Sequence, residues 1–214
     1  FLDEGGVNND PDRNLISYVN ASFAGSAAFY ILDADDLILE NSEAYGSANG
    51  TVIINSGNTN LRGRIRNIDL SGYNQYEGSG VGLLLESNSR INITNITAKY
   101  RNIGIRLMGN SDFNNISHND VSNATTYGIF LNESGSNDPE YNLIGYNNIT
   151  YVGLSGIYLE QSTGTSIFNN DFSYSNTGLN ITSNTFRSNI TNNTFFNNQW
   201  GVILGVSLIP ANNT

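Results

Sequence analysis

The stretch GIYLEQSTGTSIFNNDF, residues 156 to 172, contains both parts of a repeat that recurs through most of the chain. It begins with a tetrad of glycine, aliphatic residue, variable residue and aliphatic residue. It ends with two apolar residues five positions apart, Ile167 and Phe172, with Asn170 between them. Alternation of apolar and variable positions predicts a β-strand with one buried face for the tetrad.

The tetrad occurs six times, and its successive glycines are 22 to 28 residues apart. Its second and fourth residues are always Ile, Leu or Val, whereas the third belongs to a mixed set. A repeat of this length is typical of solenoids, in which each repeat buries its apolar face against its neighbours. The sequence therefore predicts stacked turns of short strands. The six tetrads begin at Gly82, Gly104, Gly128, Gly156, Gly178 and Gly201.

The second part of the repeat predicts a bend. Five is an odd spacing, so an unbroken strand would place the two apolar residues on opposite faces, and a bend between them returns both to the interior. Asparagine tolerates the left-handed backbone of such bends, and stacked amides can form a hydrogen-bonded ladder. The expected ladder residues are Asn119, Asn147, Asn170 and Asn193. The apolar pairs are Ile65/Leu70, Ile91/Ile96, Ile116/Val121, Ile144/Ile149, Ile167/Phe172 and Ile190/Phe195.

This pattern resembles the parallel β-helix repeats of the NosD-like and pectate-lyase-like families, which include archaeal and bacterial cell-surface proteins. The resemblance covers residues 28–204 and implies an all-β, right-handed parallel β-helix of about eight turns of 22 to 28 residues. The handedness comes from the families and not from the spacing. Residues 1–27 are expected to form an N-terminal cap or assembly segment, and residues 205–214 a C-terminal tail.

Composition excludes several classes of function. The net charge of −10 and the pI near 4.3 argue against nucleic acid and anionic membrane surfaces as partners. Cysteine is absent, so the chain has no disulfide or thiolate chemistry. No apolar run is long enough to predict a transmembrane segment. The chain begins at Phe1, which indicates a processed product, and a secreted or cell-surface location is expected.

One pair of carboxylates is a candidate for catalysis. Pectinolytic members of the related families use clustered Asp residues for calcium binding or acid–base work, with Arg or Lys as a base. Asp120 and Asp171 follow ladder asparagines two turns apart, about 10 Å by strand spacing, near the upper limit for an inverting pair. Neither lies in a recognisable catalytic motif, and solvated carboxylates at bends are the alternative. No other catalytic residue is assigned, and a non-enzymatic role is favoured.

Metal binding has one candidate site. Asp33, Asp35 and Asp36 offer the oxygen ligands that Ca²⁺ prefers, but they lack an EF-hand spacing and also suit a solvated strand edge. No other cofactor is expected. With a single histidine, His118, one methionine and no cysteine, copper handling is not expected despite the NosD-like resemblance.

Arginine and tyrosine offer candidate binding groups. Arg62, Arg64 and Arg66 alternate along a predicted strand, so they share one face and could bind an acidic sugar or the carboxylates of a neighbouring subunit. A solvated face that balances the acidic surface is the alternative. Tyr73 and Tyr76 could stack on sugars, although exposed loop tyrosines are also common without that role.

Twelve N-x-[ST] sequons occur, less than twice the number that composition alone predicts. Several place asparagine beside an inward isoleucine, and an outward asparagine on a strand can carry a glycan without disturbing the core. The alternative is that Asn-Ile-Thr simply suits the surface of a β-helix. The sequon asparagines are Asn20, Asn49, Asn92, Asn95, Asn115, Asn123, Asn132, Asn148, Asn180, Asn189, Asn192 and Asn212.

Three functions remain open from the sequence. The first is a structural, N-glycosylated extracellular protein that self-assembles as a subunit of an S-layer, sheath or surface fibre. The second is a carbohydrate-active enzyme, such as a polysaccharide lyase or hydrolase, or a sugar-binding module on the same fold. The third is a receptor-binding fibre of a phage or virus with that fold. The long solenoid, the sequons and the lack of convergent catalytic groups favour the first.

Overall fold

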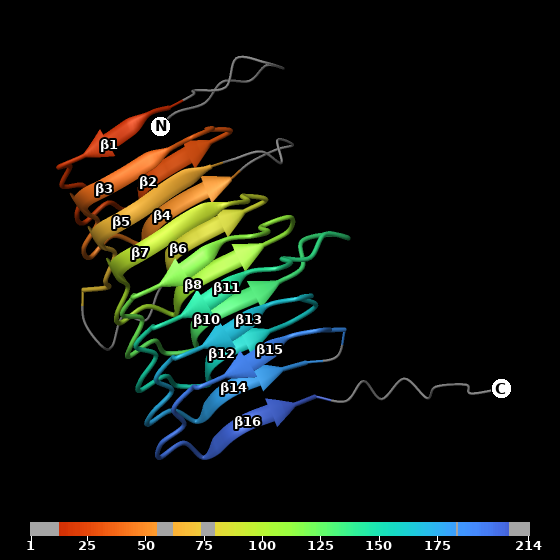
Figure 1. Cartoon of the computed structure of the whole chain (residues 1–214). Helices are drawn as coiled ribbons and strands as arrows, with labels where there is room; N and C mark the ends of the chain where they lie inside the picture. Colours follow the sequence, from red (N-terminus) through yellow and green to blue (C-terminus); the bar gives the residue numbers. More distant parts are fainter. Residues whose placement is uncertain (1–12, 55–61, 74–79, 183, 206–214) are drawn as a thin grey trace.

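The computed structural model describes residues 13–54, 62–73, 80–182 and 184–205, and these residues form a parallel β-helix (Figure 1). Each turn contributes one strand to each of two eight-stranded parallel sheets. No helix occurs within the described ranges. The expected all-β, right-handed parallel β-helix of about eight turns is confirmed.

The two sheets are formed by alternate strands, and a turn here means a strand of sheet B with the sheet A strand that follows it. Sheet A consists of β2 (Ala27–Leu32), β4 (Asn49–Ile54), β6 (Val81–Glu86), β8 (Ile103–Met108), β10 (Tyr127–Asn132), β12 (Ser155–Leu159), β14 (Thr177–Ile181) and β16 (Trp200–Leu204). Sheet B consists of β1 (Leu15–Ser17), β3 (Ile38–Glu43), β5 (Gly63–Asp69), β7 (Ile91–Thr97), β9 (Asn115–Ser117), β11 (Leu143–Gly145), β13 (Ser166–Phe168) and β15 (Asn189–Thr191).

The tetrads form the strands of sheet A, and their aliphatic residues stack in register within the core. Ile129 pairs with Ile105 on one side and with Ile157 on the other, and all three are fully buried. The tetrad glycine is required by close packing: a Cβ atom at Gly128 would lie 2.5 Å from the Ile149 side chain. The glycine therefore lets each turn approach the core and the next turn closely.

Two earlier turns follow the same plan with altered residues. In β4, Thr51 occupies an inward position in register with Leu83, and it is fully buried. Because Thr51 is polar, this copy of the tetrad does not match a pattern that requires Ile, Leu or Val at the inward positions. The turn between β4 and β6 spans 32 residues, which is longer than the predicted 22 to 28.

The bends carry the apolar pairs, with one correction to their register. Ile116 pairs with Ile93, and Ile93 pairs with Ile65, while the bridge between Thr97 and Asp120 places Ala98, and not Ile96, in register with Val121. The apolar pair of this turn is therefore Ile93/Ala98, and the predicted pair Ile91/Ile96 is wrong in both members. Ile91 and Ile93 lie two positions apart in the strand sequence INITNIT, and either could be the first member of the pair, so two registers fit the pattern. Hydrogen bonding to the neighbouring turns selects the second.

The four asparagines of the expected ladder make a continuous row of hydrogen bonds. Asn119 Nδ2 donates to Asn147 Oδ1 at 3.0 Å, Asn147 to Asn170 at 2.9 Å, and Asn170 to Asn193 at 3.0 Å. Each Nδ2 also donates to a strand carbonyl, such as that of Ile116 for Asn147. The left-handed backbone lies one residue earlier, at His118, Tyr146, Asn169 and Asn192.

The ladder ends where isoleucine replaces asparagine. The Ile96 amide donates to Asn119 Oδ1 at 3.0 Å, and Ile68 pairs with Ile96 one turn earlier. These turns continue their strands through the bend position, so β5 and β7 are seven residues long, whereas β9 has three. An apolar residue needs no side-chain partner there, and the backbone ladder extends instead.

The first turn includes part of the segment expected to form a cap. β1 lies at the edge of sheet B and pairs with β3, so residues 15–17 are part of the solenoid. In the last described turn, Val202 and Leu204 occupy aliphatic tetrad positions but are 44% and 68% exposed, because no further strand of the described residues covers them. Residues 1–12 and 206–214 lie outside the described residues.

Candidate functional site

The outer face of sheet A changes character along the solenoid. Its central column is the third tetrad position, which faces away from the core. In the first three turns this position holds an apolar residue or tyrosine. In the next four turns it holds polar or aromatic residues. In register, the column reads Tyr30, Val52, Leu84, Arg106, Phe130, Tyr158 and Asn180.

Turns three to six place aromatic and charged side chains together on this face. Arg106 lies over the Phe130 ring, 5.2 Å from its centroid, and its Nε donates to Asn132 Oδ1 at 2.9 Å. The Tyr127 and Tyr158 rings stack with centroids 4.9 Å apart. Neighbouring positions of the same face carry two acidic residues. We call this set the outer-face cluster: Glu86, Arg106, Tyr127, Phe130, Asn132, Tyr158 and Glu160.

The electrostatics of the outer-face cluster differ from those of an ordinary solvated surface. Burial lowers the pKa of Arg106, while Glu86 and Glu160 oppose that shift. Burial raises the pKa of the Tyr127 and Tyr158 phenols, and Glu160 adds to both shifts. Both phenols therefore remain protonated hydrogen-bond donors near neutral pH. Several shifted groups gathered on one surface are a physical indication of a functional site.

The outer-face cluster is suited to binding. The half-buried Tyr127 and Tyr158 rings supply apolar area at a small cost in conformational entropy, and phenol, guanidinium and carboxylate groups supply hydrogen bonds. Both Nη groups of Arg106 are without a partner among the described residues. Asn132 is buried and connects Arg106 to the Glu133 carbonyl, to which its Nδ2 donates at 2.8 Å. A ligand with hydroxyl and carboxylate groups matches this set of donors and acceptors.

Reading the sequence did not select these residues, although the signal was present. Arg106, Phe130 and Tyr158 all occupy the variable slot of consecutive tetrads. In a parallel in-register solenoid, equivalent positions of successive turns lie about 4.8 Å apart. Reading the variable slot down the repeat, rather than along the chain, would have identified the outer-face cluster.

The candidate carboxylates Asp120 and Asp171 lie in one column, with Asn148 between them. Asp120 accepts from Lys99 Nζ at 2.7 Å, from the Ser122 hydroxyl at 2.7 Å and from Asn148 Nδ2 at 3.2 Å. Burial would raise its pKa, but the hydrogen bonds from Lys99 and Ser122 lower it overall. Asp120 is therefore ionised at neutral pH and held by structural partners, which does not suit a general acid.

The candidate calcium ligands Asp33, Asp35 and Asp36 lie in the bend between β2 and β3. Asp36 lies 3.8 Å from Arg13 Nε. Within the described ranges, no group of three or more His, Asp or Glu side chains is arranged to hold a metal ion. Calcium binding at these residues stays a prediction.

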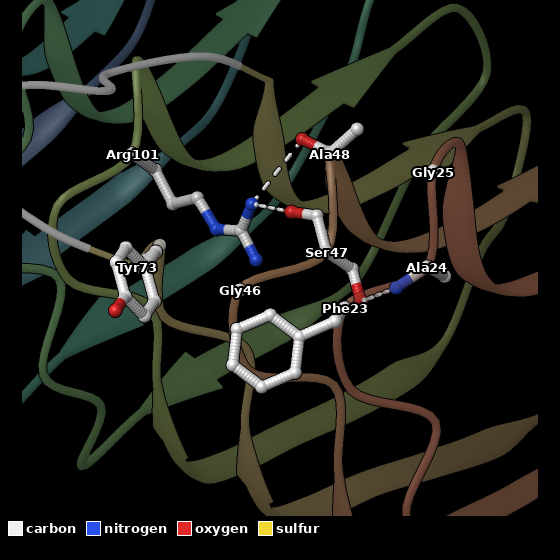
Figure 2. A pocket seen from close by; sticks show the side chains of 9 residues that line it. Phe23, Ala24, Gly25, Gly46, Ser47, Ala48, Tyr73 and Arg101 are labelled. Atoms are coloured by element: carbon white, nitrogen blue, oxygen red, sulfur yellow. Dashed lines mark hydrogen bonds between the residues drawn. The ribbon is translucent and has the colours of Figure 1, made fainter.

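A pocket of about 280 Å³ lies at another bend, and Phe23, Tyr73 and Arg101 are among the residues that line it (Figure 2). Arg101 is only 1% exposed, and its guanidinium donates to backbone carbonyls of two preceding turns: Leu70 O, Ser47 O, Ala48 O and Ser71 O. Burial lowers its pKa to about 10, against the opposing effect of Asp69. Backbone carbonyls occupy most of its donors, so Arg101 connects three turns of the solenoid.

The sequon asparagines differ widely in exposure. Asn132 is buried and hydrogen-bonded through both side-chain atoms, which makes it a poor glycan acceptor. Asn212 lies outside the described residues, as does Tyr76. Partly exposed acceptors are Asn49, Asn115, Asn123 and Asn180. Exposed acceptors are Asn20, Asn92, Asn95, Asn148, Asn189 and Asn192.

Comparison with known proteins identifies the family. The model of the family described as periplasmic copper-binding protein (NosD) matches residues 7–207, so the chain belongs to the NosD family. No curated protein matches the chain. No helix within the described residues is long and apolar enough to cross a membrane. Membership in a family described as periplasmic agrees with an extracellular or periplasmic location.

Two solved structures share the fold, both of them A-modules of mannuronan C-5 epimerases from Azotobacter vinelandii. The AlgE6 module aligns with a TM-score of 0.66 at 13% identity and covers 88% of this chain. The AlgE4 module aligns with a TM-score of 0.54 at 12% identity and covers 89% of this chain. The chain spans 56% of the length of each matched structure. At such identities the likeness shows the fold alone.

The copper in the family description does not fit the donors of this chain. Copper favours imidazole and soft sulfur ligands, and the chain has one histidine, one methionine and no cysteine. His118 stacks on Tyr146 at a bend of sheet B, with centroids 5.0 Å apart, whereas Met108 ends β8 in sheet A. These two residues lie on different sheets, and no copper chemistry is assigned to them.

Proposed function

We propose that this protein is an extracytoplasmic carbohydrate-binding β-helix that binds sugar residues on the outer face of sheet A. The observation that carries the proposal is the outer-face cluster, where Arg106 and three aromatic rings meet two carboxylates. These side chains lie outside the hydrophobic core, so packing of the core does not explain why they are present. The architecture shared with proteins named mannuronan epimerases adds support, because that fold presents long faces to extended polymers.

Binding rather than catalysis is proposed, for a chemical reason. Acid–base catalysis needs a proton-transfer group whose pKa lies near the working pH. The phenols of Tyr127 and Tyr158 have pKa values raised above the ordinary value of 10, and Glu86 and Glu160 oppose the lowering of the Arg106 pKa by burial. The outer-face cluster therefore supplies positioning, charge and apolar contact.

A glycan array identifies the ligand, and isothermal titration calorimetry then measures its affinity. Tyr158→Ala is expected to weaken binding of the strongest array ligand by about tenfold or more, as aromatic anchors do at binding sites. Tyr174→Ala is a matched control, because Tyr174 stacks on Tyr151 with centroids 4.8 Å apart but lies at a bend. Equal affinity in the wild type and Tyr158→Ala, or no array ligand at all, contradicts the proposal.

A second candidate function is a structural, N-glycosylated subunit of an S-layer, sheath or fibre. Six exposed sequon asparagines favour it. Intact mass spectrometry of protein from its natural source tests glycosylation, with modified Asn92 or Asn189 expected and unmodified Asn132. An unmodified mass together with monodisperse particles in electron micrographs contradicts this second function.

A further inference from the structure

We propose that a groove on the bend ahead of sheet B binds an acidic polysaccharide through a row of arginines. The groove has a volume of about 670 Å³ and is called the arginine groove here. It spans turns one to four at a bend, whereas the outer-face cluster lies on sheet A, so the two sites are independent. Its lining residues are Arg13, Asp36, Ile38, Arg62, Gly63, Arg64 and Arg90.

The charge of the arginine groove is opposite to that of the whole chain. The chain has a net charge of −10 and only eight arginines, and four of these line one groove. Asp36 is the one acidic residue of the lining, and its contact with Arg13 is long, at 3.8 Å, between exposed side chains. Such a contact contributes little. Concentrated positive charge on an acidic protein indicates an anionic ligand.

Strand register aligns these arginines along the solenoid axis. Leu15 pairs with Ile38, Ile38 with Arg64, and Gly63 with Ile91. The residues two positions before Leu15 and Ile38, and one before Gly63 and Ile91, therefore occupy one column, which reads Arg13, Asp36, Arg62 and Arg90. Successive positions of this column are about 4.8 Å apart, which is close to the length of one sugar unit in an extended polysaccharide.

The contacts of each arginine with neighbouring side chains indicate which arginines can bind a ligand in the arginine groove. Arg90 lies over the Phe113 ring, 5.5 Å from its centroid, and Phe113 stacks on Tyr141. Arg66 is excluded, because its Nε lies 2.7 Å from Glu40 Oε2. Only two of the three alternating arginines of the sequence therefore line the groove, and the structure adds Arg13 and Arg90 to them.

The chemistry of guanidinium selects the ligand. Its planar donors match a carboxylate in a bidentate arrangement, and it remains charged at every physiological pH. Arg62 and Arg64 are exposed and have no carboxylate partner within the described residues. A uronic-acid polymer offers one carboxylate on each sugar along a flexible chain. Nucleic acid also carries repeated charge, but it requires a wider basic surface than this protein has.

The test is fluorescence anisotropy with a labelled oligogalacturonate and the full chain. The double variant Arg62→Ala, Arg64→Ala is expected to bind at least about tenfold more weakly, because two charge-assisted contacts are lost. Arg187→Ala is the matched control, since Arg187 is exposed in the same bend column but lies outside the groove. Wild-type affinity is expected to fall steeply as salt rises, because exposed charges are screened within about 8–10 Å.

Three results would overturn the assignment. The double variant binds the oligogalacturonate as the wild type does, or the fully methyl-esterified oligomer binds equally well, or a single-stranded oligonucleotide binds more tightly. Tyr158→Ala separates this site from the outer-face cluster, because oligogalacturonate affinity is expected to fall further in the double variant than in Tyr158→Ala. If Tyr158→Ala weakens oligogalacturonate binding and the double variant does not, the oligogalacturonate binds on sheet A and not in the arginine groove.

Discussion

Arg101 and Arg106 lie five residues apart in the same turn, and burial lowers the pKa of both, yet their surroundings differ. Arg101 lies inside a bend, where four backbone carbonyls accept its hydrogen bonds. Arg106 lies on the outer face, where it contacts Phe130 and Asn132 and keeps donors for a ligand. Burial alone therefore does not distinguish the two roles. An arginine whose donors are occupied by backbone carbonyls stabilises the solenoid, whereas an arginine that keeps free donors on the surface can bind a ligand.

The largest expected effect comes from removing Arg101. Arg101→Met removes the donor to the Leu70, Ser47 and Ala48 carbonyls, while Ser71 O keeps the Gly46 amide as a donor, and we expect a loss of at least about 3 kcal/mol in the free energy of unfolding. Arg106→Met is the comparison, with an expected loss below about 1 kcal/mol. Chemical denaturation monitored by circular dichroism measures both. Similar losses in the two variants would remove the distinction between the two arginines.

The second largest loss in the free energy of unfolding is expected from a substitution in the asparagine ladder. Asn147→Leu removes an acceptor for Asn119 and a donor to Asn170 and to the Ile116 carbonyl. Asn170 Oδ1 keeps the Asn147 backbone amide and Asn119 Nδ2 keeps the Ile93 carbonyl. The Asn119 backbone amide and the Ile116 carbonyl, however, lose the Asn147 side chain, which is expected to cost about 2 kcal/mol. Asn189→Thr, at an exposed strand position, serves as the control. An unchanged unfolding midpoint for Asn147→Leu would show that the ladder does not stabilise the bends.

The smallest effect is expected at Asp120, and it depends on pH. Its folded pKa lies below the ordinary value of 3.8 because of Lys99 and Ser122. Its stabilising contribution is therefore present above that value and is lost as the pH falls through it toward the folded pKa. Asp120→Asn is expected to cost less than about 1 kcal/mol at neutral pH, since the pair is partly exposed. Thermal unfolding should show the difference shrinking below pH 3.8, and a difference that grows there would contradict the assignment.

The fold could be predicted from the sequence because one physical constraint recurs in every turn. Aliphatic residues at alternate positions, with glycine where turns approach closely, leave few architectures other than a solenoid. The inward residues of β7 were harder to predict, because the sequence INITNIT fits two registers. Only pairing with adjacent turns shows that Ile93, and not Ile91, is in register with Ile65 and Ile116.

The candidate sites could be predicted less well, because they arise across turns. Arg106, Phe130 and Tyr158 are 24 and 28 residues apart in the chain, and the in-register sheet makes them neighbours. Arg13 and Arg90 join Arg62 for the same reason. Asp120, by contrast, was visible in the sequence, but its hydrogen bonds to Lys99 and Ser122 depend on the folded bend.

The most direct test of the account is a crystal structure of the protein in complex with the glycan that binds most strongly on the array. The account predicts sugar residues over Tyr158, with hydroxyl or carboxylate groups at the Nη atoms of Arg106. An empty outer-face cluster would contradict the proposal that the outer face of sheet A binds sugar.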